Sequence, residues 1–135
     1  MREQLPLQPL RAFLKLIRPV FLLGGILLYG LGLAVAAAEG AAIEWLPAVL
    51  GQLMVSAIQL MAQCTNEYHD IDADRQNAAG RTPFSGGSGV LPAGGLNPAI
   101  VLAVARVCAL AASALALMLA AVSPLVAGIA LLALF

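Results

Sequence analysis

Apolar residues form four long runs along the chain, separated by short polar segments. The first run, residues 19–38, contains no charged residue. A helix rises about 1.5 Å per residue, so a run of this length crosses the hydrocarbon core of a bilayer. The other runs cover about residues 45–70, 98–121 and 124–135. The pattern predicts an all-α, multi-pass transmembrane helical bundle with three complete spans and the start of a fourth.

The composition agrees with a membrane environment. Of the 135 residues, 61% are hydrophobic and only 10% are charged, whereas about a quarter of the residues in a soluble domain are charged. The formal net charge is zero, so no basic field indicates nucleic acid as a partner. Asn97 and Pro98 have the residue types of an N-cap and a first helical position, which marks the start of the third span.

Both ends of the apolar pattern allow another interpretation. The basic leader, residues 1–18, followed by an apolar run and small residues, resembles a secretory signal peptide. The run is long for that purpose and further spans follow, which favours a retained helix. The run 124–135 is too short to cross a bilayer. We therefore expect residues 1–135 to be the N-terminal part of one transmembrane domain of a longer protein.

Basic residues predict the orientation in the membrane. The leader carries Arg2, Arg11, Lys15 and Arg18, and the segment 71–97 carries Arg75 and Arg81. The connection between the first two spans offers only Glu39 and Glu44. The positive-inside rule therefore places the N-terminus and the 71–97 loop in the cytoplasm.

Polar side chains follow one face of the second span. At about 100° per residue, eight polar positions fall within an arc about 100° wide. They are Gln52, Ser56, Gln59, Gln63, Asn66, Glu67, Asp70 and Asp74, and we call them the polar stripe. Amides can join membrane helices by hydrogen bonds. Carboxylates beside lipid are costly and usually mark a hydrated or ion-filled site, so the stripe predicts a cavity open to the cytoplasm.

Asn66, Asp70 and Asp74 are spaced i, i+4 and i+8 and would share one face if the helix persists to Asp74. Their oxygens are suitable ligands for Mg²⁺, which keeps several waters and binds substrate phosphates. The spacing favours a metal-bridged diphosphate over a closed protein cage. An EF-hand beginning at Asp70 fails, because Arg75 and Arg81 occupy the positions of its glycine and its glutamate.

Residues 78–96 form a segment rich in glycine, serine and proline. It contains no P-loop and no dinucleotide-binding turn. It could be a plain linker. Alternatively, Arg81 and exposed backbone N–H groups could close over a diphosphate, because both are donors suited to phosphate oxygens.

The stretch "NEYHDIDADR", residues 66–75, resembles the first aspartate-rich motif, NxxxDxxxD, of the UbiA superfamily of membrane prenyltransferases. Asn66, Asp70 and Asp74 match the motif, and the pair Arg18-Pro19 before the first span also resembles this family. The Asn-acidic-Tyr opening is similar to the branch that includes 1,4-dihydroxy-2-naphthoate prenyltransferases. The resemblance covers roughly residues 10–135.

The resemblance implies about nine helices around a cavity, in an integral protein of a bacterial or archaeal plasma membrane. It implies an enzyme that moves an isoprenoid chain from a prenyl diphosphate to a small acceptor, often an aromatic quinone precursor. Mg²⁺ would be the cofactor, with Asn66, Asp70 and Asp74 as catalytic and metal-binding residues. The expected substrate-binding residues are Arg18, Gln59, Gln63, Arg75 and Arg81. The family's second aspartate-rich motif is absent, so this part alone is expected to be inactive.

Two other functions remain compatible with the residues. An ion-coupled transporter or channel subunit could use the polar stripe as a cation path, with carboxylates near the middle of the membrane. A small structural membrane subunit could end at Phe135. Both differ from the prenyltransferase in having no need for an isoprenoid donor.

Overall fold

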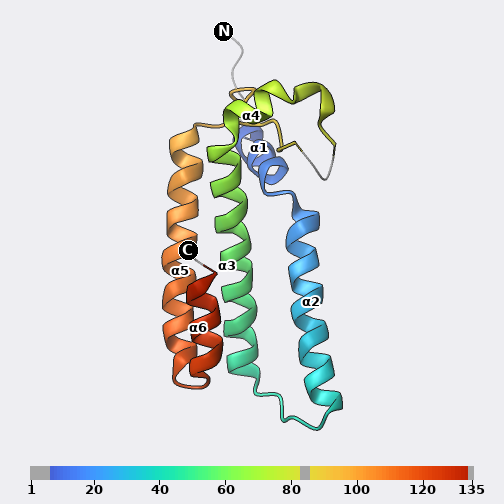
Figure 1. Cartoon of the computed structure of the whole chain (residues 1–135), viewed down its shortest axis with the longest axis vertical. Helices are drawn as coiled ribbons and strands as arrows, with labels where there is room; N and C mark the ends of the chain where they lie inside the picture. The colour runs from blue at the N-terminus through green and yellow to red at the C-terminus, as the bar shows by residue number, and fades with distance from the viewer. Residues whose placement is uncertain (1–6, 83–85, 134–135) are drawn as a thin grey trace.

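A computed structural model describes residues 7–82 and 86–133, and within them the chain forms helices and no strands (Figure 1). Arg2, the middle of the glycine-rich segment and the end of the fourth apolar run lie outside the described residues. The helices are α1 (Leu7–Ile17), α2 (Pro19–Ala38), α3 (Trp45–His69), α4 (Ile71–Gln76), the 3₁₀ helix η1 (Ala78–Gly80), α5 (Pro98–Ala120) and α6 (Pro124–Leu132).

Three of these helices, α2, α3 and α5, are long and apolar enough to cross a membrane. The prediction of an all-helical chain with three such segments is therefore confirmed. The start of α5 also follows its predicted signals. Asn97 is the N-cap, and its side-chain oxygen accepts a hydrogen bond of 2.9 Å from the backbone N–H of Ala99.

α3 lies at the centre of the bundle, and its most extensive helix contact is with α5 (Figure 1). Ala105, Ala112 and Ala116 are buried along one side of α5. Small side chains on a membrane helix let the backbones of two helices approach closely. At the far end from α4, α6 adds Ala130 to a buried cluster with Met54 of α3.

Two polar side chains join α2 to α3. The hydroxyl of Tyr29 donates to a backbone carbonyl of α3, and Gln59 Nε2 donates to the carbonyl oxygen of Phe21 over 3.1 Å. A Cβ atom at Gly51 would clash with the Tyr29 hydroxyl, and one at Gly25 would clash with the Gln59 amide. Each polar side chain therefore occupies space that a glycine on the facing helix leaves free.

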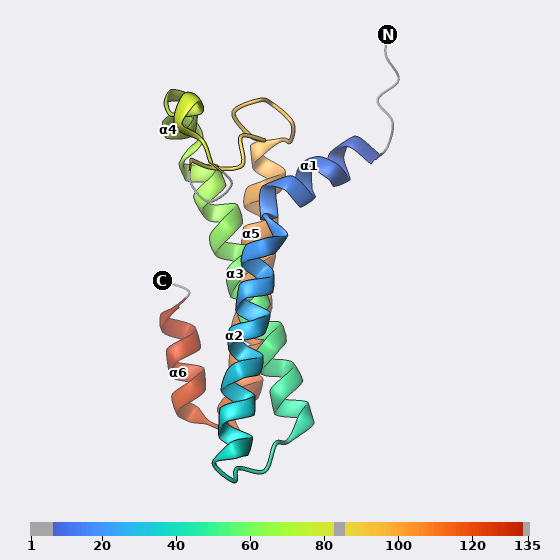
Figure 2. The same cartoon turned by 90° about the vertical axis from the view of Figure 1, so that its right-hand side faces the viewer.

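α1 and α2 are separated by a sharp turn at Arg18 (Figure 2). Arg18 has φ of 43° and ψ of 77°, the only positive φ of a non-glycine residue within the described ranges. This conformation is unfavourable for a residue with a Cβ, and more so before a proline. The turn is held by buried Leu16 and Ile17, which belong to a cluster with Cys64 and Val90.

Candidate functional site

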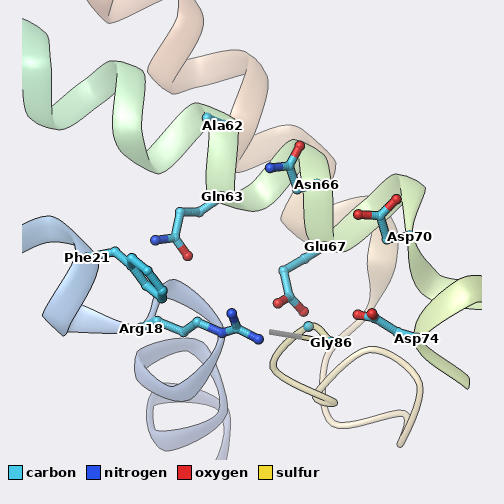
Figure 3. A pocket seen from close by; sticks show the side chains of 10 residues that line it. Arg18, Phe21, Ala62, Gln63, Asn66, Glu67, Asp70, Asp74 and Gly86 are labelled. Carbon is cyan, nitrogen blue, oxygen red and sulfur yellow. The ribbon is translucent and has the colours of Figure 1, made fainter. Parts of the chain in front are cut away.

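A cavity of about 320 Å³ lies where the end of α3, α4, the start of α2 and the glycine-rich segment meet (Figure 3). We call it the acidic pocket. It is lined by Arg18, Phe21, Ala62, Gln63, Asn66, Glu67, Asp70, Asp74, Gly86 and Gly87. Three carboxylates and one guanidinium therefore share a single opening.

The polar stripe continues from α3 into α4 through a bend at Asp70. α3 ends at His69, but the N–H of Asp70 still donates to the carbonyl of Asn66 (2.9 Å), and the N–H of Asp74 to that of Asp70 (2.7 Å). The backbone therefore keeps the i, i+4 hydrogen bonds that the predicted spacing requires. As a result Asn66, Asp70 and Asp74 line the same pocket, although they are not on one regular helix.

Asp74 is a buried carboxylate, with 6% of the residue exposed. Its Oδ2 atom is buried and has no hydrogen-bond partner in the described structure. Gly87 lies directly against this carboxylate, and a Cβ atom at position 87 would clash with it. Gly87 also has φ of 65°, a conformation that glycine adopts readily. An unpaired buried carboxylate oxygen is costly, which marks Asp74 as the side chain most in need of a ligand.

Glu67 is also buried, with 6% exposed, but both of its oxygens have partners. The backbone N–H of Ser88 donates to Oε1 and the Ser88 hydroxyl donates to Oε2, each over 2.6 Å. Ser88 Oγ in turn accepts from the N–H of Val90 over 3.1 Å. Glu67 is therefore bound to Ser88 of the glycine-rich segment.

Arg18 brings a positive charge to the opposite wall of the acidic pocket. In Figure 3 its guanidinium extends toward Glu67 and Gly86. The guanidinium carbon lies 5.9 Å from the centre of the Phe21 ring, within range of a cation–π contact. The left-handed backbone at Arg18 makes the turn that directs this side chain into the pocket.

A second cavity of about 400 Å³ adjoins the first, and we call it the basic pocket. It is lined by Lys15, Arg18, Ala78, Arg81, Thr82, Gly87 and Ser88. Arg18 and Gly87 line both cavities. Among the described residues, three cations and no carboxylate line the basic pocket, so it is suited to an anion next to the acidic pocket.

The structure brings five of the predicted site residues to the acidic pocket, namely Arg18, Gln63, Asn66, Asp70 and Asp74. It places the other three elsewhere. Gln59 joins α3 to α2 through its bond to Phe21. Arg75 is exposed and forms an ion pair of 2.8 Å with Asp72.

Arg81 is the third, and it reaches the basic pocket only. Its Nε donates to the carbonyl of Gly86 over 2.9 Å, and its Nη2 donates to the backbone carbonyl of Asp74 over 3.2 Å. Arg81 therefore supports the glycine-rich segment from within and does not extend over the acidic pocket. Arg81 lines the basic pocket together with Lys15.

The sequence pattern did not identify Lys15, Phe21 or Ser88. Lys15 was noted for its charge, but no pattern connects α1 to a segment some seventy residues later. Ser88 is an ordinary residue of a glycine-rich segment, and only the fold shows its contact with Glu67. In the sequence, the glycines on both sides of Ser88 were the one signal of a special turn. Both of them have a positive φ in the structure.

The oxygen donors fit part of a divalent-cation site. Asn66, Asp70 and Asp74 line one pocket, and the unpaired Oδ2 of Asp74 is a suitable ligand atom. Within the described ranges, no three His, Cys, Asp or Glu side chains are grouped closely enough to hold a metal. These residues could hold Mg²⁺ only together with waters and phosphate oxygens, or with groups from elsewhere.

Comparison of the chain with protein-family models, curated proteins and solved structures finds no match. A function for this chain is therefore inferred from the pocket residues and from the motif in the sequence.

Proposed function

We propose that this chain is the N-terminal part of a membrane prenyltransferase of the UbiA type. The enzyme would transfer an isoprenoid chain from a prenyl diphosphate to a small acceptor, typically an aromatic quinone precursor. The observation that carries the proposal is the buried, unpaired Oδ2 of Asp74 in an acidic pocket that adjoins a basic one. A metal-bound diphosphate requires this pairing of oxygen ligands with cations.

In this proposal the residues divide according to charge. Asp70 and Asp74 hold the cation, and the Asn66 amide orients a water or a phosphate oxygen. Arg18 and Lys15 bind the diphosphate oxygens from the basic side. Mg²⁺, when bound, supplies Lewis-acid stabilisation of the leaving group. The pocket favours the departure of the diphosphate, because its charged side chains are already in position when the allylic C–O bond breaks.

The acceptor step is part of the same proposal. The allylic C–O bond breaks and the diphosphate leaves with the electron pair. An acceptor ring carbon then forms the new C–C bond and loses a proton. Phe21 and Ala62 line the acidic pocket and give the isoprenoid an apolar wall, beyond which the faces of the long helices continue.

We propose further that the pocket opens to the cytoplasm, since the positive-inside rule assigns that side to the α1 and α4 end. The remaining helices of the longer protein would supply a second aspartate-rich helix end on the same side. The downstream coding sequence is the cheapest check. A downstream region without such a motif would contradict the assignment.

The biochemical test uses the full-length protein and Asp70→Asn. We expect Mg²⁺-dependent release of diphosphate from a prenyl diphosphate to be abolished, and chelation by EDTA to abolish wild-type release. Asp72→Asn is the matched control, because Asp72 is exposed and lies outside the pocket. Turnover that is unchanged in Asp70→Asn would rule out the metal role.

The positions of the carboxylates give little support to the alternative function, a transporter or channel subunit with a cation path along the polar stripe. Asp70 lies after the last residue of α3 and Asp74 lies in α4. A transporter would place its carboxylates near the middle of a membrane helix. Ion flux that persists without any isoprenoid donor, with no diphosphate release, would favour this alternative.

A further inference from the structure

Glu67 differs from the other carboxylates of the acidic pocket in being fully engaged by protein. Its two bonds to Ser88 are 2.6 Å long, and both partners are buried. Hydrogen bonds to an ionised carboxylate are shorter and stronger than neutral ones. Using Glu67 as a metal ligand would take an acceptor from the buried N–H of Ser88, which is costly.

We propose that Glu67 is a positioning residue, whose carboxylate holds the segment 86–89 through Ser88 and thereby keeps Asp74 turned into the pocket. Its motif neighbours Asn66 and Asp70 have no such partner. Among the described residues their side chains form no hydrogen bond, and both are exposed at the pocket.

The effect passes from Ser88 to Asp74 through the adjacent glycine. Gly87 lies against the Asp74 carboxylate so closely that no side chain fits between them. Any movement of Ser88 must move Gly87, which forms the wall on which Asp74 rests. On the other side of Ser88, Val90 and Leu91 are buried in the cluster with Leu16 of α1. The segment is thus held by the buried Val90 and Leu91, by the bond from Arg81 to the Gly86 carbonyl, and by the Glu67–Ser88 contact. The last of these is made by a carboxylate of the acidic pocket.

The same contact separates the two cavities. Glu67 lines the acidic pocket, Ser88 lines the basic pocket, and Gly87 lines both. The bonds between Glu67 and Ser88 therefore also set the distance between the cation ligands and the cations that would bind phosphate. This second consequence rests on the proposed function, whereas the fixing of the segment does not.

Three variants of the full-length protein test the inference. Glu67→Ala removes both bonds, whereas Ser88→Ala removes only the hydroxyl bond and keeps the backbone N–H bond to Glu67 Oε1. Glu67→Gln removes the charge but can keep the contact, because its amide oxygen accepts from the Ser88 N–H and its amide nitrogen donates to Ser88 Oγ. Asp72→Asn serves as the control, since Asp72 is exposed and its ion pair is with Arg75.

The first measurement is hydrogen–deuterium exchange over residues 86–91. We expect about tenfold faster exchange in Glu67→Ala, a smaller change in Ser88→Ala and in Glu67→Gln, and none in Asp72→Asn. Because this measurement involves no metal, its outcome does not depend on the proposed enzyme activity. Exchange that is unchanged in Glu67→Ala would overturn the positioning role.

The second measurement is Mn²⁺ binding, followed by electron paramagnetic resonance. We expect about tenfold weaker binding in Glu67→Ala, since partners of a metal ligand typically contribute this much, and a smaller loss in Ser88→Ala. The double variant should be no weaker than Glu67→Ala, and Glu67→Gln should stay near wild type. If Glu67→Gln were as weak as Glu67→Ala while Ser88→Ala bound normally, Glu67 would be a ligand and the inference wrong.

The two measurements separate the failure of this inference from the failure of the proposed function. A wild-type protein that binds no Mn²⁺ but shows the expected exchange pattern contradicts the metal site and supports the fixing of the segment.

Discussion

The polar stripe on α3 has two halves that contain similar residues and behave differently. In the half far from the pocket, polar side chains form hydrogen bonds within α3 or to α2. Gln52 donates to Ser56 Oγ over 3.2 Å, and Gln59 donates to a carbonyl of α2. In the half that lines the pocket, the side chains of Gln63, Asn66 and Asp70 form no hydrogen bond within the described ranges.

The difference arises from where the neighbouring helix begins. Gln59 bonds to Phe21, and α2 starts at Pro19, two residues earlier. One helical turn beyond Gln59, the stripe no longer faces α2. It faces the turn at Arg18, which precedes the first residue of α2. Polar residues on one helix face are therefore used for helix contact or left for a ligand according to what lies opposite them.

Gly87→Ala should produce the largest loss in the pocket half. The new Cβ would clash with Asp74 and would be strained at a positive φ. We expect Mn²⁺ affinity in the full-length protein to fall about tenfold or more. Gly94→Ala is the matched control, because Gly94 also has a positive φ but has open space around it. Equal losses in both variants would show that strain alone is responsible.

Gln63→Ala and Gln59→Ala should affect different properties if the two halves of the stripe differ in this way, one lowering turnover and the other lowering stability. Gln59→Ala should lower the free energy of unfolding by about 1 kcal/mol, through loss of its bond to α2, and leave Mn²⁺-dependent turnover unchanged. Gln63→Ala should leave unfolding within about 0.5 kcal/mol and reduce turnover several-fold. Thermal unfolding in detergent and a diphosphate-release assay would measure both. The same pattern in the two variants would remove the distinction.

Tyr29→Phe tests the helix-contact half by a smaller change. It removes the hydroxyl bond of 2.9 Å to the Ala48 carbonyl and keeps the ring. Hydrogen bonds between membrane helices contribute about 0.6 kcal/mol on average, so a small drop in unfolding temperature is expected, with activity intact. A loss of activity without a loss of stability would indicate that α2 reaches the ligand at this level too.

Arg75→Ala should have the smallest effect. Arg75 pairs with Asp72 on the surface, and exposed ion pairs contribute about 0–1 kcal/mol. We expect the KM for the prenyl diphosphate to be unchanged. An increase of about tenfold in KM would restore Arg75 to the substrate site, where the sequence had placed it.

The three long helices could be predicted from the sequence, because backbone groups in lipid must bond within their own segment and long apolar runs have few alternatives to a helix. The helices α1 and α4 were not predicted, since they lie outside these runs. The projection of the second apolar run also grouped Gln63, Asn66, Asp70 and Asp74, since the i, i+4 backbone hydrogen bonds continue from α3 through Asp70 into α4. It treated α3 in isolation, however, and so could not show that α2 begins beside Gln59.

Contacts between distant segments were also beyond the sequence pattern. Arg81 appeared to be a phosphate ligand from its position in a glycine-rich segment, but its guanidinium bonds to carbonyls of its own surroundings. Glu67 and Ser88 are 21 residues apart, and no helical periodicity connects them. Such pairs depend on how the segment folds back over the end of α3.

The two glycines that receive polar side chains fix the register of α2 against α3. A shift of α2 by one helical turn, about 5.4 Å, would move Gly25 away from Gln59 and Tyr29 away from Gly51 at the same time. Neither side chain could be accommodated by a residue with a Cβ at those positions. α2 is therefore held at one position along α3. Because Arg18 directly precedes α2, its position beside the carboxylates is fixed as well.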